Sequence, residues 1–131
     1  MDIDVDFRQL TELDEDFNAL PKTFMPKVQK RVNRGAFNIK RDWKQRWEGH
    51  DHIPHLPNAI SYDVYRRGDF VGSEIGPDKD KRQGPLGSLV EFGSINNAPI
   101  PGGVPALELE EPRFVDAMAD LGEQGLGDGP R

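Results

Sequence analysis

Apolar residues recur at helical spacing near the start of the chain. They are three or four positions apart, at Phe7, Leu10, Leu13, Phe17 and Leu20. This spacing places them on one side of a helix, and Pro21 follows the last of them. Asp4 and Asp6 come just before, where carboxylates cap the first amides and meet the positive end of the helix dipole. We expect a short amphipathic helix with an acidic outer side.

A longer helix is predicted from Pro26 to Trp47. Its apolar positions again recur every three or four residues, at Val28, Val32, Ala36, Ile39, Trp43 and Trp47. Pro26 suits the first turn of a helix, and Gly49 suits its end. Trp43 and Trp47 could stack nucleic-acid bases beside the neighbouring basic residues. Because they continue the apolar stripe, we expect them in the core instead.

Period-two patterns follow the long helix. Polar residues alternate with Ile60, Tyr62 and Val64, and again with Val71 and Ile75, around a tight turn at Gly68-Asp69. Arg67, Gly68 and Asp69 form an RGD tripeptide that turn chemistry alone explains. Alternation over residues 86–92 predicts a third strand. The charged segment 78–84 between the strands predicts a projecting loop.

The last part of the chain predicts a C-terminal helix. Pro105 opens it, Pro112 is expected to kink or break it, and Leu121 is its last apolar position before a glycine-rich end. The predicted fold is α+β: a long central helix packed on a small antiparallel sheet of about three strands, with N- and C-terminal helices. We expect one domain over residues 1–121 and a flexible tail over residues 122–131.

Charge is strongly segregated along the chain. The whole chain has 17 Lys and Arg against 23 Asp and Glu, a net charge of -6. Residues 1–20 hold seven acidic residues and one basic residue, whereas residues 22–47 hold nine basic residues and one acidic residue. A basic helix can neutralise phosphates, but here the chain also carries the opposite charge. Pairing within or between subunits and nucleic-acid binding therefore both stay open.

Candidate catalytic chemistry is sparse. The chain has no Cys, which excludes disulfides, thiolate metal sites and thiol nucleophiles. No phosphate-binding glycine loop or serine elbow is present, and Glu110 and Glu111 fit an exposed acidic helix start. His50, His52 and His55 are close in sequence but lack a defined fourth ligand. We expect no enzyme activity and no cofactor, with a small metal-dependent enzyme as a weaker alternative.

Membrane insertion and export are not indicated. The longest uncharged stretch, residues 93–107, is interrupted by three Pro and three Gly, and the acidic N-terminus does not suit a signal peptide. We therefore expect a protein that starts in the cytoplasm and has no membrane partner.

Three segments of the second half share order and spacing with a known family. They are Glu74-Ile75-Gly76-Pro77 after the long helix, Leu89-Val90-Glu91-Phe92-Gly93-Ser94, and Pro99 with Pro101 leading to Pro105-Ala106-Leu107-Glu108. With them the chain resembles lambdoid-type tail components of siphophages, which are neck proteins that complete the tail or join it to the head. The chain departs from the family pattern at residues 52–61, where only Ile60-Ser61 is shared, and at residues 101–104, where the usual Pro-Phe-Leu is missing.

The resemblance implies a structural protein of the virion, assembled in the bacterial cytoplasm. It would form a ring around a lumen through which DNA passes, and it would dock to connector or head-completion proteins and to tail-terminator or tail-tube proteins. The resemblance implies no cofactor and no reaction.

On this hypothesis the subunit and partner interface has two parts. One part lies on the basic helix, and the other lies in the segment of the family motif and the proline-rich loop: Arg31, Arg34, Phe37 and Arg41, then Val90, Glu91, Phe92, Gly93, Pro99, Ile100 and Pro101. Packing under the first helix is an equal alternative for Phe37. The alternative function is a nucleic-acid-binding accessory protein that uses the basic helix, residues 27–46.

Overall fold

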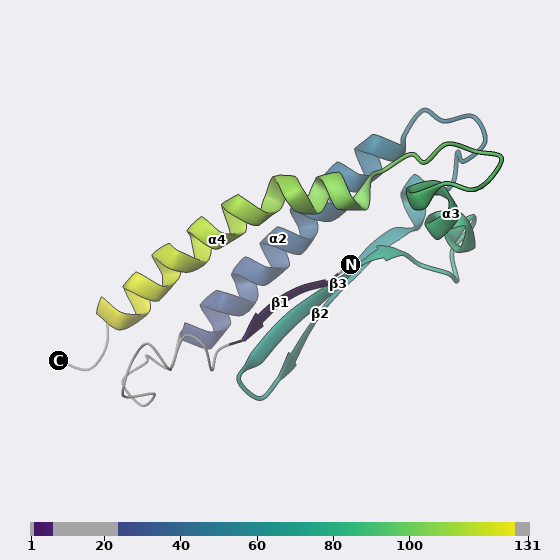
Figure 1. Cartoon of the computed structure of the whole chain (residues 1–131). Helices are drawn as coiled ribbons and strands as arrows, with labels where there is room; N and C mark the ends of the chain where they lie inside the picture. The colour runs from purple at the N-terminus through teal and green to yellow at the C-terminus, as the bar shows by residue number, and fades with distance from the viewer. Residues whose placement is uncertain (1, 7–23, 128–131) are drawn as a thin grey trace.

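Two long antiparallel helices and a three-stranded sheet form the body of the protein (Figure 1). The computed structural model describes residues 2–6 and 24–127, with side chains over residues 24–123. The elements in chain order are β1 Asp2–Asp6, α2 Phe24–Trp47, η2 Pro57–Ala59, β2 Ile60–Arg67, β3 Phe70–Pro77, η3 Gly84–Leu86, α3 Gly87–Phe92 and α4 Gly103–Gly127. The predicted α+β class is confirmed. The predicted helix over residues 7–20 lies outside the described residues.

Helix α2 confirms the predicted long helix. It starts two residues before Pro26, at Phe24, and ends at Trp47. Its buried residues recur every three or four positions: Phe24, Val28, Val32, Gly35, Ala36, Ile39, Trp43 and Trp47. Gly49 follows with a φ of +80°, a conformation that glycine adopts at low cost after a helix end. One continuous apolar stripe therefore runs the whole length of the helix.

Strands β2 and β3 form the predicted hairpin. Arg67 pairs with Phe70, so Gly68 and Asp69 make a two-residue turn, and Gly68 has a φ of +60°. Tyr62 pairs with Ile75 and lies on the face of the sheet that packs on α2. The RGD tripeptide, Arg67 to Asp69, lies at this hairpin turn, as predicted.

The third strand of the sheet is β1, and the sheet order is β1-β3-β2. Asp2 pairs with Glu74 and Asp6 with Phe70. Asp4 and Asp6 therefore lie in a strand, and the helix start that they were expected to cap lies outside the described residues. The physical reason is that β3 would otherwise leave one row of backbone groups unpaired, and the alternating Asp-Ile-Asp-Val-Asp sequence has the period of a strand.

The segment 86–92 is helical, so the predicted strand there is wrong. A 3-10 turn over Gly84–Leu86 leads into helix α3, Gly87–Phe92. Gly87 and Glu91 are buried four residues apart, which is helical rather than alternating spacing. A Cβ at Gly87 would lie 2.5 Å from Pro77, so only glycine allows α3 to approach the end of β3 this closely.

Helix α4 is longer than predicted. It begins at Gly103, two residues before Pro105, and ends at Gly127. Pro112 lies inside it on an exposed position, and the helix continues without the expected break. A proline interrupts one internal hydrogen bond, but its ring here faces solvent. The helix also extends over residues 122–127 of the expected tail, and residues 128–131 lie outside the described part of the chain.

The core lies along α2 and includes both tryptophans, as predicted. Trp43 and Trp47 pack edge to face with ring centroids 5.4 Å apart. The Trp47 indole N–H donates to the Ile100 carbonyl at 2.8 Å. A Cβ at Gly102 would lie 2.6 Å from the Trp43 ring, so the start of α4 rests directly on the indoles. The tryptophan pair therefore holds the proline-rich loop and α4 against α2.

Candidate interaction surfaces

The outer face of α2 is basic. Lys27, Lys30, Arg31, Arg34, Phe37 and Arg41 are exposed on it, on the side of the helix opposite the buried stripe; we call these six residues the basic ridge. The ridge contains one apolar residue: Phe37 is 42% exposed, and the Arg41 guanidinium lies 5.8 Å from the centre of its ring. Four of the predicted interface residues, Arg31, Arg34, Phe37 and Arg41, are thus brought together on one surface.

The cations of the basic ridge have no ion-pair partner among the described residues. The only acidic residue of α2, Asp42, pairs with Arg46 at 2.7 Å, outside the ridge. An open groove of about 700 Å³ runs along the ridge and is lined mainly by its residues. Pairing of this charge within the chain, one of the two expected explanations, is therefore not seen in the part of the chain that the structure describes.

Helix α4 carries the opposite charge on its outer face. Its exposed acidic residues are Glu108, Glu111, Asp116, Asp120 and Glu123, which we call the acidic ridge. Its neighbour Glu110 is buried, in contrast to the expectation of an exposed acidic helix start, because it accepts a hydrogen bond of 3.0 Å from the Asn38 side chain of α2. Charge counting by segment showed that this part of the sequence is acidic, but it did not show which acids share a face.

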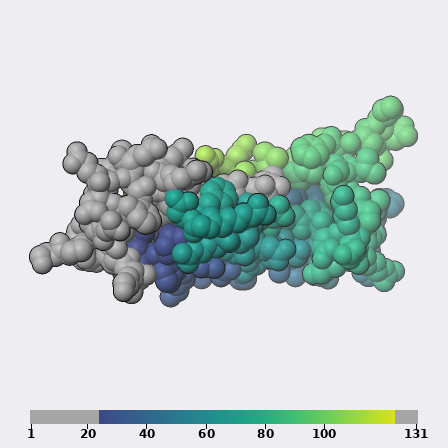
Figure 2. All heavy atoms as spheres, turned by 90° about the horizontal axis from the view of Figure 1, so that it is seen from below, coloured from purple at the N-terminus to yellow at the C-terminus, as the bar shows by residue number. Residues whose placement is uncertain are grey.

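The two ridges belong to opposite edges of the molecule. Figure 2, seen from the sheet side, shows α2 along one long edge and the visible atoms of α4 at the opposite edge. The helices touch through their apolar sides and through Asn38 and Glu110. Among the described residues, the basic ridge and the acidic ridge are thus carried by two different helices.

A second surface lies at the end of the molecule that carries α3 (Figure 1). Four large apolar side chains are exposed there, which we call the apolar tip: Leu86, Leu89, Phe92 and Ile95. Phe92 is 72% exposed and Ile95 is fully exposed. Clustered apolar exposure of this kind is typical of a protein-binding surface. Of the predicted interface residues in this region, Phe92 lies on this surface, and Pro99 and Pro101 are exposed in the loop that follows.

The other predicted residues of this region are structural in the described chain. Val90 and Ile100 are half-buried against the core, and the Ile100 amide donates to the Val90 carbonyl at 2.7 Å. Gly93 has a φ of +78°, and a Cβ there would lie 2.8 Å from the Pro99 nitrogen. These contacts fold the proline-rich loop back on α3 and so shape the apolar tip from inside.

Glu91 is a buried carboxylate that caps the start of α4. It is 6% exposed, and its carboxylate accepts hydrogen bonds of 2.9–3.2 Å from the amides of Gly102, Gly103 and Val104. A buried carboxylate at these amides satisfies the free donors at the start of α4 and meets the positive end of its dipole. Glu91 was expected at a partner interface, and in this structure its carboxylate is used internally.

The histidine-containing segment shows no convergence of its side chains. Within the described residues, no group of three or more His, Asp and Glu side chains is arranged to hold a metal ion. Gln83 links the segment to the loop before α3: its side chain accepts from the His55 amide at 2.7 Å and donates to the His52 carbonyl at 3.3 Å. Among the described residues, no helix is long and apolar enough to cross a membrane.

Comparison with known proteins adds no relative. No family model, curated protein or solved structure matches the chain. The two charged ridges and the apolar tip are the surfaces of the described chain that point to a function.

Proposed function

We propose that the chain is a structural subunit of a bacteriophage head–tail junction, a neck or tail-completion protein that forms a ring and docks to the rings above and below it. One observation carries the proposal. Two exposed ridges of opposite charge occupy opposite edges of one small molecule and leave each other unpaired. A subunit that repeats around a ring needs two different, complementary sides, and these edges meet that need.

The apolar tip supports the same function. It lies at one end of the long helices rather than on a charged edge, so a ring built through the edges would present the tips of all its copies together. Exposed Phe and Ile side chains suit a contact that excludes water at its centre. We assign the tip to an adjacent connector or tail protein.

Glu91 connects two of the segments that carry the motif resemblance. The resemblance includes Val90-Glu91-Phe92-Gly93 and Pro105-Ala106-Leu107, which are separated by the proline-rich loop. In the structure, Glu91 of the first segment caps the helix in which the second segment lies. The two segments are thus one structural unit, which supports the proposal that they belong to one family pattern.

Gene deletion and complementation test this function directly. In a phage that encodes the chain, deletion is expected to yield filled heads and finished tails that remain separate in negative-stain electron microscopy. Complementation with the wild-type gene should restore joined particles. Complementation with Phe92→Ala should do so poorly, whereas Phe92→Leu, which keeps an apolar side chain, serves as the matched control. Normal particles in the deletion strain would contradict the proposal.

Nucleic-acid binding is the second candidate, and the unpaired cations of the basic ridge favour it. Each phosphate contact made by the ridge should contribute about 0.9 to the slope of log affinity against log salt. Retention on duplex DNA that is lost in Arg31→Glu/Arg34→Glu/Arg41→Glu would support this candidate. Absence of retention at low salt would exclude it.

A further inference from the structure

We infer that the basic ridge of one copy docks on the acidic ridge of a second copy, and that this contact repeats head to tail. The inference deepens the proposed function, on which it rests for its biological setting, by naming the partner and the surfaces. Four features of the described residues support it: charge, placement, level along the helices, and an apolar centre in each ridge.

The charges of the two helices complement each other. Helix α2 has eight basic residues and one acidic residue, and helix α4 has six acidic residues and one basic residue. Like charges crowded on one helix repel, so each ridge gains when the opposite ridge of another molecule approaches it. A second copy of this chain supplies that opposite ridge without any further partner.

The placement of the ridges keeps the acidic ridge from pairing with the basic ridge of the same molecule. Each ridge faces outward from its own edge, and the sides of α2 and α4 that face each other are filled by the core and by the Asn38–Glu110 hydrogen bond. The contact between copies therefore joins two different surfaces. Such a heterologous contact generates a ring when the rotation between neighbours closes.

The charged residues also occupy matching levels along the helices. Asn38 marks the level of Glu110, and the helices run antiparallel with the same rise per residue. Counting from this pair, Arg41 lies close to the level of Glu108, and Arg31 close to that of Asp116. Lys27 reaches the level of Asp120 in the same way. A neighbour related by rotation about an axis along the helices keeps these levels and brings the opposite charges together.

Each ridge has an exposed apolar residue near its centre. On α2 it is Phe37, and on α4 it is Val115, which is 57% exposed; Leu109, 43% exposed, lies near one end of the acidic ridge. By the same count, Phe37 lies near the level of Leu109. An apolar centre surrounded by charges is the usual anatomy of a protein interface, in which the apolar residues supply affinity and the charges supply orientation.

Cross-linking tests the contact cleanly, because the natural chain has no Cys. Arg31→Cys and Asp116→Cys are introduced singly and together, and the full chain is treated with a bis-maleimide of about 10 Å reach, which suits the spacing of packed helices. The double variant should give a ladder of covalent multimers. A mixture of the two single variants should give mainly the mixed dimer, at least tenfold above either variant alone.

The matched control moves one cysteine away from the ridge. Lys79→Cys, on an exposed loop, combined with Asp116→Cys should give no ladder. Monomers alone from the Arg31→Cys/Asp116→Cys double variant would overturn the inference. A covalent dimer that never extends would overturn it as well, because that product indicates a two-fold rather than a head-to-tail contact.

Reversing the charges of each ridge gives an independent test. Sedimentation at low salt measures how strongly the variants associate. Arg31→Glu/Arg34→Glu/Arg41→Glu and Glu108→Lys/Asp116→Lys/Asp120→Lys should each associate at least tenfold more weakly than the wild type. Mixing the two variants should restore association, since each ridge then meets its opposite in alternating copies. A mixture that stays monomeric while the wild type assembles would overturn the inference. A ladder together with normal phage assembly in the deletion strain would instead refute only the proposed function.

Discussion

The helix pair and the apolar tip distribute polarity in opposite ways. Along α2 and α4, the charged ridges face solvent and the apolar stripes are buried. At the tip, the carboxylate of Glu91 is buried and Phe92 and Ile95 are exposed. Exposed charges cost little and orient partners, whereas a buried, fully bonded carboxylate fixes a local structure. The helix pair is therefore suited to guide assembly, and the tip is suited to hold a partner.

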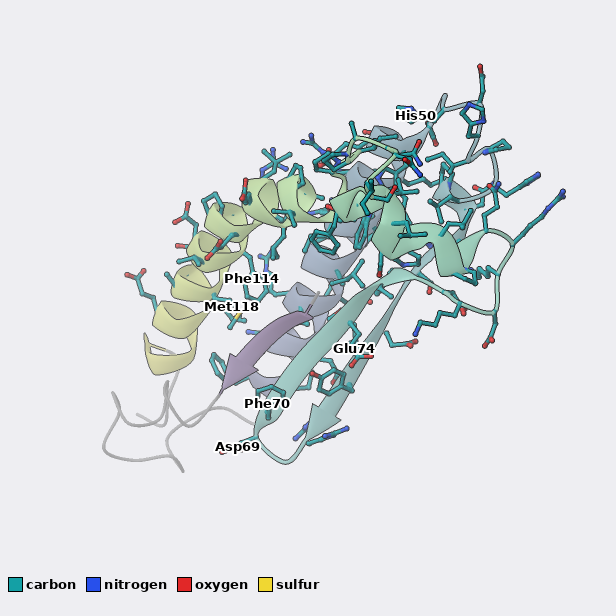
Figure 3. The ribbon with its side chains drawn as sticks, turned by 45° about the vertical axis from the view of Figure 1, so that its right-hand side comes forward. His50, Asp69, Phe70, Glu74, Phe114 and Met118 are labelled. Carbon is teal, nitrogen blue, oxygen red and sulfur yellow. The ribbon has the colours of Figure 1, made fainter. Side chains whose placement is uncertain are left out.

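Figure 3 shows the same contrast within the body of the protein. Phe114 and Met118 lie on the side of α4 that faces the rest of the molecule, whereas Asp69, Phe70 and Glu74 lie at the hairpin and its open face. Met118 belongs to the buried cluster that also contains Phe24 and Val71. The interior of the helix pair is mostly apolar, with the buried carboxylate of Glu110 and the side chain of Asn38 as its polar contact.

The largest expected loss of stability follows from replacing the buried carboxylate of Glu91. Glu91→Ala should lower the free energy of unfolding by about 3 kcal/mol, because the buried amides of Gly102 and Gly103 and the part-buried amide of Val104 lose a charged acceptor. Glu91→Gln, which keeps one acceptor oxygen, should cost about half as much. Chemical denaturation measures both. Glu108→Ala, on the exposed acidic ridge, should change the stability by less than about 0.5 kcal/mol, and an equal loss there would remove the distinction between tip and ridge.

A smaller loss is expected where α4 begins on the tryptophans. Gly102→Ala should cost about 2 kcal/mol, since the added methyl group would lie 2.6 Å from Trp43. Gly122→Ala, inside α4, is the matched control, because a Cβ there meets nothing within 4 Å. It should stabilise the protein by about 0.8 kcal/mol through helix propensity. Thermal unfolding measures both changes in stability. A stabilising Gly102→Ala together with a destabilising Gly122→Ala would disprove this packing.

At the apolar tip, binding should change while folding does not. Phe92→Ala and Ile95→Ala should each leave the free energy of unfolding within about 0.5 kcal/mol of the wild type, because both side chains are exposed. Each should reduce the yield of joined particles about tenfold, equivalent to about 1.4 kcal/mol of partner binding. Electron microscopy counts the particles. Unchanged yields would show that the tip has no partner in the particle.

The smallest expected effect is a gain in stability rather than a loss. Arg31→Glu places a carboxylate four residues after Lys27 and relieves a repulsion on the basic ridge, so the isolated subunit should gain about 0.5 kcal/mol at low salt. Differential scanning calorimetry at low and high salt measures this gain, which should shrink as salt screens the charges. A clear destabilisation would mean that Arg31 already has a stabilising partner within its own chain.

The sequence predicted the helix pair better than the tip, for a physical reason. In α2, burial follows one regular stripe, so spacing alone located the helix and placed both tryptophans in the core. In α3, Leu89 and Phe92 are exposed and Glu91 is buried, so hydrophobicity no longer reports burial and the predicted strand was wrong. The proximity of Glu91 to the amides of Gly102 and Gly103 depends on the chain folding back, which local patterns do not encode.

Two further features could have been found from the sequence. The alternation in residues 2–6 is the ordinary signal of a strand, but Asp4 and Asp6 suggested a helix start instead. The acidic positions of α4 follow helical spacing, and plotting them on a helix would have separated the acidic ridge from the buried Glu110. The contact between the basic ridge of one copy and the acidic ridge of another forms only in the assembly. The sequence of a single chain shows the two ridges but not their contact.

A density map of the assembled particle by electron cryomicroscopy tests the central claim most directly. The account predicts a ring in which the basic ridge of each copy lies against the acidic ridge of the next, with Phe37 near the neighbour's α4. A ring in which the basic ridge faces solvent or duplex DNA, with no contact to a neighbouring α4, would contradict it.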